Sequence, residues 1–175
     1  MYEPFFNGIQ CMTIPPARIV NWVLFAGCSM LMAVALTFQH VMGLEPCILC
    51  ITQRIMVISI GLLALVAALH NPGTTGIRVY AGLMTVTAIT GGAIAIRQLW
   101  LQSLPADQVP ACGPSLDYLL DVFPLTEVLQ KVFLGDGNCA EVLWTLFGIS
   151  IPGWTLVAFI GLAGCAIGQI LYPRA

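Results

Sequence analysis

The sequence predicts an all-α membrane protein, built as a bundle of four transmembrane helices with one long loop outside the bilayer. Of its 175 residues, 59% are hydrophobic and 8% are charged, and the mean hydropathy is +0.94. So few charges cannot cover a water-soluble surface, so we expect the protein to lie in a lipid bilayer. We expect no nucleic-acid partner. Four apolar runs each reach the roughly 20 residues that a helix needs to cross about 30 Å of hydrocarbon.

The whole chain, residues 1–175, is expected to form a single membrane domain. The predicted order is a tail over 1–18, a span over 19–38, a loop over 39–49, a span over 50–69, a turn over 70–77, a span over 78–96, a loop over 97–151, a span over 152–171 and a tail over 172–175. The turn contains Asn71-Pro72-Gly73, a strong turn signal, and its brevity makes the second and third spans antiparallel neighbours.

Basic residues at the ends of the spans predict how the chain lies in the membrane. Arg18, Arg78 and Arg174 flank spans on the side of the termini, and such residues favour the cytoplasmic side. We therefore expect a bacterial inner-membrane protein with cytoplasmic termini and two periplasmic loops. Arg18 and Ala33-Val34-Ala35 also resemble a cleaved signal peptide, but the apolar run continues to Phe38, beyond the usual length of a signal core.

A short amphipathic helix is predicted inside the long loop, from Pro124 to Phe133. Its apolar residues recur at helical spacing and its polar residues lie opposite them. The apolar face consists of Leu125, Val128, Leu129, Val132 and Phe133. Ten residues cannot cross the bilayer, so we expect this helix to lie flat in the membrane interface, with a cap over the bundle as the alternative.

The seven cysteines separate into an inner, an intramembrane and an outer group. Cys11 lies in the inner tail, and Cys28 and Cys165 lie within spans, where a single thiol is usually a small packing residue. The outer group consists of Cys47, Cys50, Cys112 and Cys139. The periplasm is oxidising, so two structural disulfides are one interpretation of these four. For the two loop cysteines, 112 and 139, the residues alone leave a structural and a redox role open.

The pair Cys47 and Cys50 is better suited to redox exchange than to a structural disulfide. A bridge across two intervening residues removes little chain entropy and so stabilises little. Pro46 can occupy the first turn of the second span, which places both thiols near unpaired backbone N–H groups at the positive end of the helix dipole. Both effects favour the reactive thiolate. The pair is therefore a candidate catalytic dithiol.

Arg54 lies one and two helical turns deeper than the two thiols, on the same face of the helix. An arginine just below the membrane surface is costly and is therefore a candidate functional residue, although it can also snorkel to the headgroups. Its cation can stabilise a thiolate at Cys50 or the charge that develops on an electron acceptor at the same edge. A flat, lipid-soluble quinone fits there, so Arg54 is the predicted cofactor-binding residue; we predict no metal site.

Four segments of the chain, in register from the first span to just before the fourth, carry a family resemblance. They are Phe38-Gln39-His40-Val41-Met42, Glu45-Pro46-Cys47-Ile48-Leu49-Cys50 with Arg54, Trp100-Leu101-Gln102 leading to Cys112, and Gly135-Asp136-Gly137-Asn138-Cys139-Ala140-Glu141. In combination they resemble the DsbB family, the quinone-reducing membrane thiol oxidases. The resemblance implies a protein-dithiol:quinone oxidoreductase that reoxidises a DsbA-like periplasmic oxidase of thioredoxin fold and passes two electrons to ubiquinone or menaquinone.

The resemblance also implies a role for each outer cysteine. Cys112 would form the mixed disulfide with the DsbA-like partner, and Cys139 would be its disulfide mate. Cys47 would exchange with this loop pair through a transient bond to Cys139, while Cys50 would face the quinone as a thiolate beside Arg54. The resting connectivity stays open between Cys47/Cys50 with Cys112/Cys139 and an interloop Cys47/Cys139 bond.

One position departs from the family pattern, and several alternatives remain. Family members can carry a histidine near the outer end of the third span, where this chain has Gln98, so the roles of Gln98 and of neighbouring Arg97 stay open. Arg97 can take over that role or anchor the helix at the interface.

The alternatives are a vitamin K epoxide reductase-like quinone enzyme, which the outer-loop pair fits less well, a metal-binding membrane protein, and a structural adaptor with closed disulfides.

Overall fold

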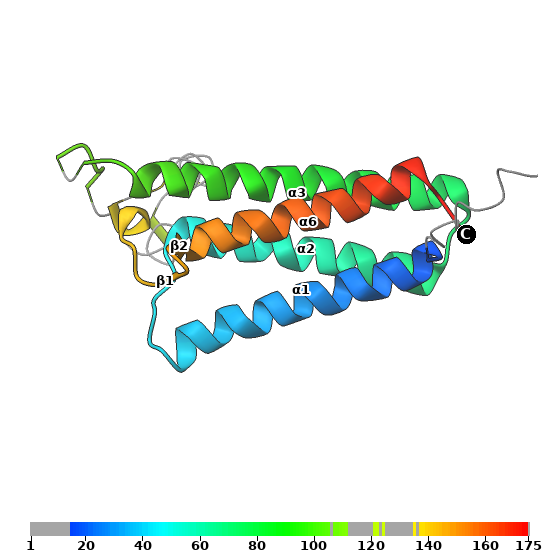
Figure 1. The fold of residues 1–175 in the computed structure, drawn as a ribbon, viewed down its shortest axis with the longest axis horizontal. Helices are drawn as coiled ribbons and strands as arrows, with labels where there is room; N and C mark the ends of the chain where they lie inside the picture. Colours follow the sequence, from blue (N-terminus) through cyan, green and yellow to red (C-terminus); the bar gives the residue numbers. More distant parts are fainter. Residues whose placement is uncertain are drawn as a thin grey trace, which may run out of the picture.

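Four long helices run side by side along the long axis of the molecule (Figure 1). The structure, a computed structural model, describes residues 15–105, 107–111, 121–122, 124, 135 and 137–174. Within these residues the four helices long and apolar enough to cross a membrane are α1 (Ala17–His40), α2 (Ile48–His70), α3 (Thr74–Gln102) and α6 (Ile151–Leu171). This confirms the predicted all-α, four-helix membrane fold.

Each predicted span lies inside one of these helices, but α3 is longer than predicted. It runs over 74–102 and so extends beyond the predicted span 78–96 at both ends; at its N-terminal end this is because the turn before it is confined to three residues. Asn71, the C-cap of α2, has a left-handed backbone with φ 45°, and Gly73 is the N-cap of α3. Asparagine tolerates this conformation and proline cannot continue a helix, so Asn71-Pro72-Gly73 alone reverses the chain.

The helices pack in chain order, with α1 on α2, α2 on α3 and α3 on α6. The approach of α3 and α6 depends on Gly91, because a Cβ there would overlap the ring of Phe159. Helices α1 and α6 meet near the chain termini, where the Ala17 N–H donates to the Arg174 carbonyl over 3.0 Å. Toward the other end of the bundle, hereafter the open end, α1 diverges from α6 (Figure 1).

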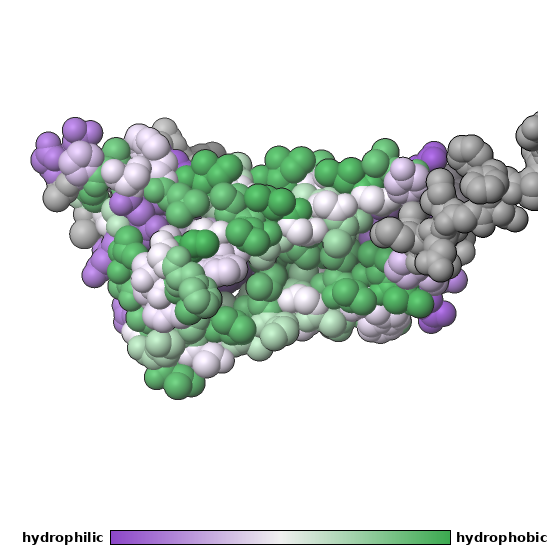
Figure 2. All heavy atoms as spheres, in the orientation of Figure 1, coloured by the Kyte–Doolittle hydropathy of each residue, from purple (hydrophilic) through white to green (hydrophobic). Residues whose placement is uncertain are grey.

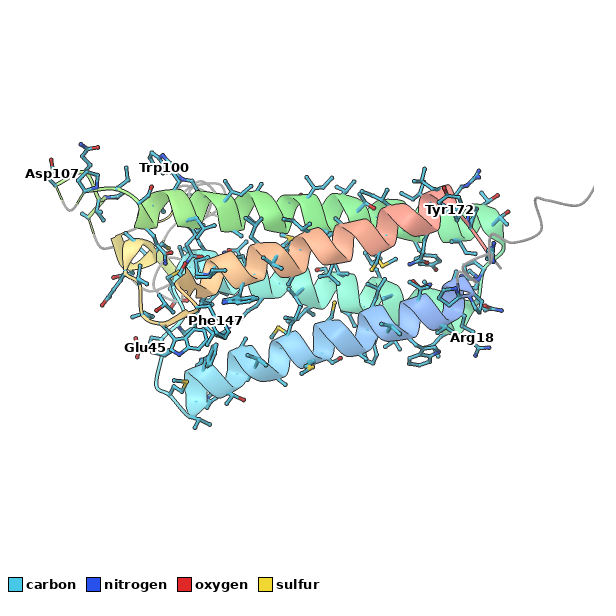
Figure 3. All side chains as sticks on the ribbon, in the orientation of Figure 1. Arg18, Glu45, Trp100, Asp107, Phe147 and Tyr172 are labelled. Carbon is cyan, nitrogen blue, oxygen red and sulfur yellow. The ribbon has the colours of Figure 1, made fainter. Side chains whose placement is uncertain are left out.

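The surface of the bundle matches a membrane-spanning protein. Figure 2 shows an apolar band over the middle of the helices and polar residues at both ends. Outward-facing side chains such as Val23, Met30 and Val86 are more than 60% exposed, as lipid-facing residues are in the absence of a bilayer. In Figure 3, Arg18 and Tyr172 lie at the end of the termini, and Glu45, Trp100 and Asp107 lie at the opposite, open end. The chain is thus a multi-pass membrane protein.

Three short elements lie at the open end: a 3₁₀ turn, η1 (Gly137–Ala140), and the hairpin of β1 (Thr145–Leu146) and β2 (Ile149–Ser150). Phe147 and Gly148 connect the two strands with φ of 53° and 77°, the two positive values that a tight hairpin turn requires. The sequence patterns did not predict this hairpin. The amphipathic helix predicted from Pro124 to Phe133 lies, apart from Pro124 itself, outside the described residues.

Candidate active site at the open end of the bundle

The dithiol pair lies where α2 begins. Cys47 is the N-cap of α2 with an extended backbone, and its carbonyl accepts the first helical bond from the Ile51 N–H at 3.0 Å. Pro46 therefore precedes the cap and does not occupy the first turn, contrary to the expectation from the sequence. Cys50 lies in that turn, and the Cys47 thiol donates to its sulfur over 3.2 Å. The two sulfurs are thus close enough to join as a disulfide with little movement.

Cys139 belongs to the same cluster although it is far from the pair in sequence. It lies in η1 with no exposed surface, packed against apolar residues of α2 and α3 that include Leu49 and Leu101. Hydrogen bonds to Cys139, and secondarily to Cys50, raise the pKa of the Cys47 thiol. Three of the four outer cysteines thus meet at one point, and the fourth, Cys112, lies outside the described residues.

A glycine places η1 against the helices. Gly135 has φ +71°, and a Cβ at this position would lie 2.8 Å from Leu101 Cδ1 and 2.9 Å from Leu49 Cδ1. The chain can pass this closely over α2 and α3 because glycine has no side chain and tolerates positive φ. The Gly137 N–H also donates to the Ala111 carbonyl over 3.3 Å, which ties η1 to the beginning of the long loop.

Two buried glutamines complete the dithiol site. Gln98 Nε2 lies 3.2 Å from Cys50 Sγ and 3.4 Å from Cys47 Sγ, and its Oε1 accepts a 2.8 Å bond from Gln53 Nε2. The sequence left the role of Gln98 open and did not single out Gln53. A signal was available, because each of the two is an uncharged amide inside an apolar helix. A buried amide needs hydrogen-bond partners, so such a residue is a candidate for a contact with a polar group of another helix.

The Arg54 guanidinium is held by α1. Its Nη1 donates to Gln39 Oε1, and its Nη2 donates to the Ala35 carbonyl over 3.2 Å. The arginine side chain is therefore held against α1 near the open end. Gln39 belongs to a segment that carries the family resemblance, but its contact with Arg54 could not be inferred from spacing because the two residues lie on different helices.

An apolar cavity of about 300 Å³ opens beside the dithiol between α1, α2 and the start of α6. Cys50, Gln53 and Arg54 supply polar groups on one wall. The opposite walls are formed mainly by apolar residues of α1, of the segment before β1, and of α6. They include Leu31, Phe38, Leu143, Trp144, Ile151 and Pro152. Phe38 and Trp144 contact each other across the space between α1 and that segment, with ring centroids 4.9 Å apart.

Other residues singled out in the sequence lie away from this cavity. The Arg97 guanidinium stacks over the Trp100 ring at 4.3 Å, an arrangement suited to an anchor at the membrane interface. Cys28 is buried in the helix core against Gly61, and Cys165 is exposed on the outside of α6. The position of Cys28 matches the packing role expected of it, whereas the same expectation is wrong for Cys165, whose side chain is exposed. Cys11 lies outside the described residues.

Comparison with known proteins identifies the family. A family model described as "Disulfide bond formation protein DsbB" matches residues 17–169. The chain is 58% identical over 158 residues to a disulfide bond formation protein B of Hahella chejuensis, covering 90% of this chain and 96% of that protein. Similar matches are to proteins of Saccharophagus degradans (51% identity, covering 89% and 94%) and Pseudomonas aeruginosa (46%, covering 91% and 98%). The chain therefore belongs to the DsbB family of membrane oxidoreductases that act in disulfide bond formation.

Proposed function

We propose that this protein reoxidises a DsbA-like periplasmic thiol oxidase and passes the electrons to a membrane quinone, with Cys47, Cys50, Cys112 and Cys139 as the catalytic residues. The observation that carries the proposal is the position of the Cys47/Cys50 dithiol. On one side it contacts Cys139 of the loop pair, and on the other Cys50 lines an apolar cavity together with Arg54. A relay between a soluble donor and a lipid-soluble acceptor requires both contacts.

The exchange steps balance as two successive transfers of an electron pair. A thiolate of the reduced donor attacks the Cys112/Cys139 disulfide at Cys112, and the second donor thiol then displaces Cys112, leaving the donor oxidised and the loop pair reduced. The Cys139 thiolate next attacks the Cys47/Cys50 disulfide at Cys47 and releases Cys50 as a thiolate. Attack by Cys112 on Cys139 restores the loop disulfide and leaves Cys47 as a thiol.

The residues of the apolar cavity fit a quinone headgroup. A cavity of about 300 Å³ is at the lower limit of typical small-molecule sites, and its long apolar walls suit an isoprenoid chain. Arg54, fixed by Gln39, would hold the headgroup oxygen and stabilise negative charge there, and Cys50 would face the ring as a thiolate. Ubiquinone or menaquinone, when bound, would accept two electrons from the Cys50 thiolate and the Cys47 thiol, together with the Cys47 proton and a second proton from water, and would become the quinol.

This chemistry requires the open end of the bundle to face the periplasm. The basic residues Arg18 and Arg78 lie on the side of the chain termini, which supports cytoplasmic termini by the positive-inside rule. The cysteine cluster and the long loop then lie on the periplasmic side of a bacterial inner membrane, where a soluble thiol oxidase can reach Cys112. We also propose that residues 1–175 form one membrane domain, with the spans and loops predicted from the sequence.

The test is quinone reduction by the purified, detergent-solubilised protein with reduced DsbA as the donor, followed by ultraviolet absorbance. We expect turnover by the parent protein and none by Cys50→Ser, with Cys165→Ser as a matched cysteine control that retains turnover. Absence of turnover with both ubiquinone and menaquinone would refute the proposal. Stoichiometric copper or zinc in the same preparation would then favour the metal-binding alternative.

A further inference from the structure

Gln98 is a buried amide that contacts both sulfurs of the dithiol pair. Its side chain is 3% exposed, and Nε2 lies 3.2 Å from Cys50 Sγ and 3.4 Å from Cys47 Sγ. A carboxamide NH₂ group has two N–H donors, so one nitrogen can serve both sulfurs at once. Gln98 comes from α3, whereas both thiols belong to the start of α2, so the contact forms only when the two helices pack.

Gln53 donates to the amide oxygen of Gln98, so that the Gln98 NH₂ group is left to face the sulfurs. Gln53 Nε2 donates to Gln98 Oε1 over 2.8 Å, and Gln53 is also buried. With its oxygen held in this way, Gln98 turns its NH₂ group to the sulfurs, while Oε1 also accepts a longer hydrogen bond of 3.7 Å from the Cys50 thiol. The reversed amide would set the NH₂ group of Gln98 against that of Gln53 and leave a buried donor without a partner, which is costly.

We propose that Gln98 is a positioning residue that stabilises the reduced pair by donating its amide hydrogens to Cys50 and Cys47, and that Gln53 orients it. This inference rests on the proposed function, in which the pair cycles between disulfide and dithiol. A disulfide sulfur is a weak acceptor, whereas a thiolate accepts charge-assisted bonds that are about twice as strong as neutral ones. The Gln98 contact therefore favours the reduced form over the disulfide.

The consequence is a more oxidising dithiol pair. Reduction of the Cys47/Cys50 disulfide consumes two electrons and one proton and yields a Cys50 thiolate and a Cys47 thiol, the electrons coming from the reduced loop pair. Any contact that stabilises these products raises the tendency of the pair to accept electrons. Gln98 would thus assist the step that draws electrons inward from Cys139. Its contact with both sulfurs gives it a role in the thiol chemistry, independent of the quinone.

The chain offers a matched control for this inference in Gln169. That residue is 5% exposed, and its Nε2 donates to Asn21 Oδ1 over 3.1 Å, but it lies at the opposite end of the bundle near the chain termini. Leucine at either position removes a buried amide of the same size from a helix–helix contact. Gln98→Leu and Gln169→Leu therefore carry comparable packing changes, and only Gln98→Leu alters the thiols.

The first measurement is the rate at which iodoacetamide alkylates Cys50 as a function of pH, in the reduced full-length protein carrying Cys47→Ser. On the acidic side of this profile, where the thiolate fraction limits the rate, we expect Gln98→Leu to slow alkylation about tenfold, the effect of a lost hydrogen bond to a charged group. Gln98→Glu, which keeps the volume but adds a negative charge, should slow it further, and Gln169→Leu should change it less than twofold. An unchanged or faster rate in Gln98→Leu would overturn the proposal.

The second measurement is the equilibrium of the Cys47/Cys50 pair with glutathione, in protein carrying Cys112→Ser and Cys139→Ser. Gln98→Leu should shift this equilibrium about tenfold toward the disulfide, which corresponds to about 30 mV for a two-electron couple. An equal shift in Gln169→Leu, or none in Gln98→Leu, would contradict the inference. Neither measurement uses quinone or a DsbA partner. The Gln98 inference can therefore fail while quinone turnover is observed, and quinone turnover can be absent while the Gln98 inference holds.

Discussion

Gly135 is the residue on which the contact between the loop cysteine and the helix dithiol depends most directly. It lies four residues before Cys139 with φ +71°, and its Cα passes so close to α2 and α3 that a Cβ would meet Leu101 Cδ1 at 2.8 Å and Leu49 Cδ1 at 2.9 Å. Gly135→Ala therefore adds a backbone strain of about 1–2 kcal/mol for a left-handed residue. The crowding adds about 1 kcal/mol more, because the two methyl groups can shift only at the expense of core packing.

The matched control is Gly148→Ala, since Gly148 has φ +77° but a Cβ there would meet no atom within 4 Å. Both variants carry the same backbone strain, and only Gly135→Ala pushes against the helices. The extra strain of about 1 kcal/mol should act on the docking of η1, which holds Cys139 against Cys47. Since a factor of ten in an equilibrium constant corresponds to about 1.4 kcal/mol, this strain lowers the equilibrium constant for docking η1 on α2 and α3 roughly fivefold.

The assay is the effective concentration of the Cys47/Cys139 pair, measured from the fraction of interloop disulfide at a series of glutathione ratios. The protein carries Cys50→Ser and Cys112→Ser, so that these two thiols are the only outer pair left. We expect Gly135→Ala to lower the effective concentration about fivefold relative to Gly148→Ala. Identical values for the two variants would refute the argument that the close approach of Gly135 positions Cys139.

Three further predictions concern the proposed relay. Cys50→Ser should abolish quinone reduction with reduced DsbA, whereas Cys28→Ser should retain most of it because Cys28 packs in the core against Gly61; ultraviolet absorbance of the quinone measures both. Arg54→Met should raise the KM for quinone about tenfold through loss of a charged hydrogen-bond donor. Disulfide exchange between DsbA and the loop pair should keep the parent rate, measured in rapid-quench samples. Equal loss of quinone reduction and of disulfide exchange would instead indicate a folding role for Arg54. Reduced Cys47 should be alkylated more slowly than free cysteine at pH 7. Hydrogen bonds to Cys139 and Cys50 raise its pKa above the ordinary value of about 8.5, so its thiolate forms only at higher pH. Mass spectrometry of the labelled peptide measures the rate, and a rate equal to that of free cysteine would contradict these contacts.

The sequence was sufficient for the features that depend on local chemistry. The four helices follow from the length of the apolar runs, and the reversal between α2 and α3 follows from Asn71-Pro72-Gly73. The candidate redox pair, Cys47 and Cys50, could be proposed because two cysteines three residues apart stabilise a fold little as a disulfide. Arg54 could be proposed as a functional residue because a charged side chain inside an apolar helix is costly. Each of these inferences uses residues within one helix or one turn.

The contacts between helices could not be read from the sequence. Gln98 and Gln53 are separated by 45 residues, and their 2.8 Å bond exists only through the register in which α2 and α3 pack. Register follows from the summed fit of many side chains, and α3 gives little guidance because small and apolar residues lie around its whole circumference. The anchoring of Arg54 by Gln39 of α1 was hidden for the same reason.

The two ends of the bundle differ in a way that explains where the reactive residues lie. Near the termini, α1 and α6 are tied by the Ala17–Arg174 backbone bond and by the Gln169–Asn21 amide pair. At the opposite end the two helices separate, and Phe38 of α1 instead meets Trp144 of the segment after η1. Cys50 lines the apolar cavity that lies between α1, α2 and α6 at this end, as the proposed transfer to a hydrophobic acceptor requires. The same parting leaves the first turn of α2 accessible to η1, and hence to Cys139. The open end thus satisfies both requirements of the proposed relay: it brings a thiol from the loop to one side of the dithiol and an apolar cavity to the other.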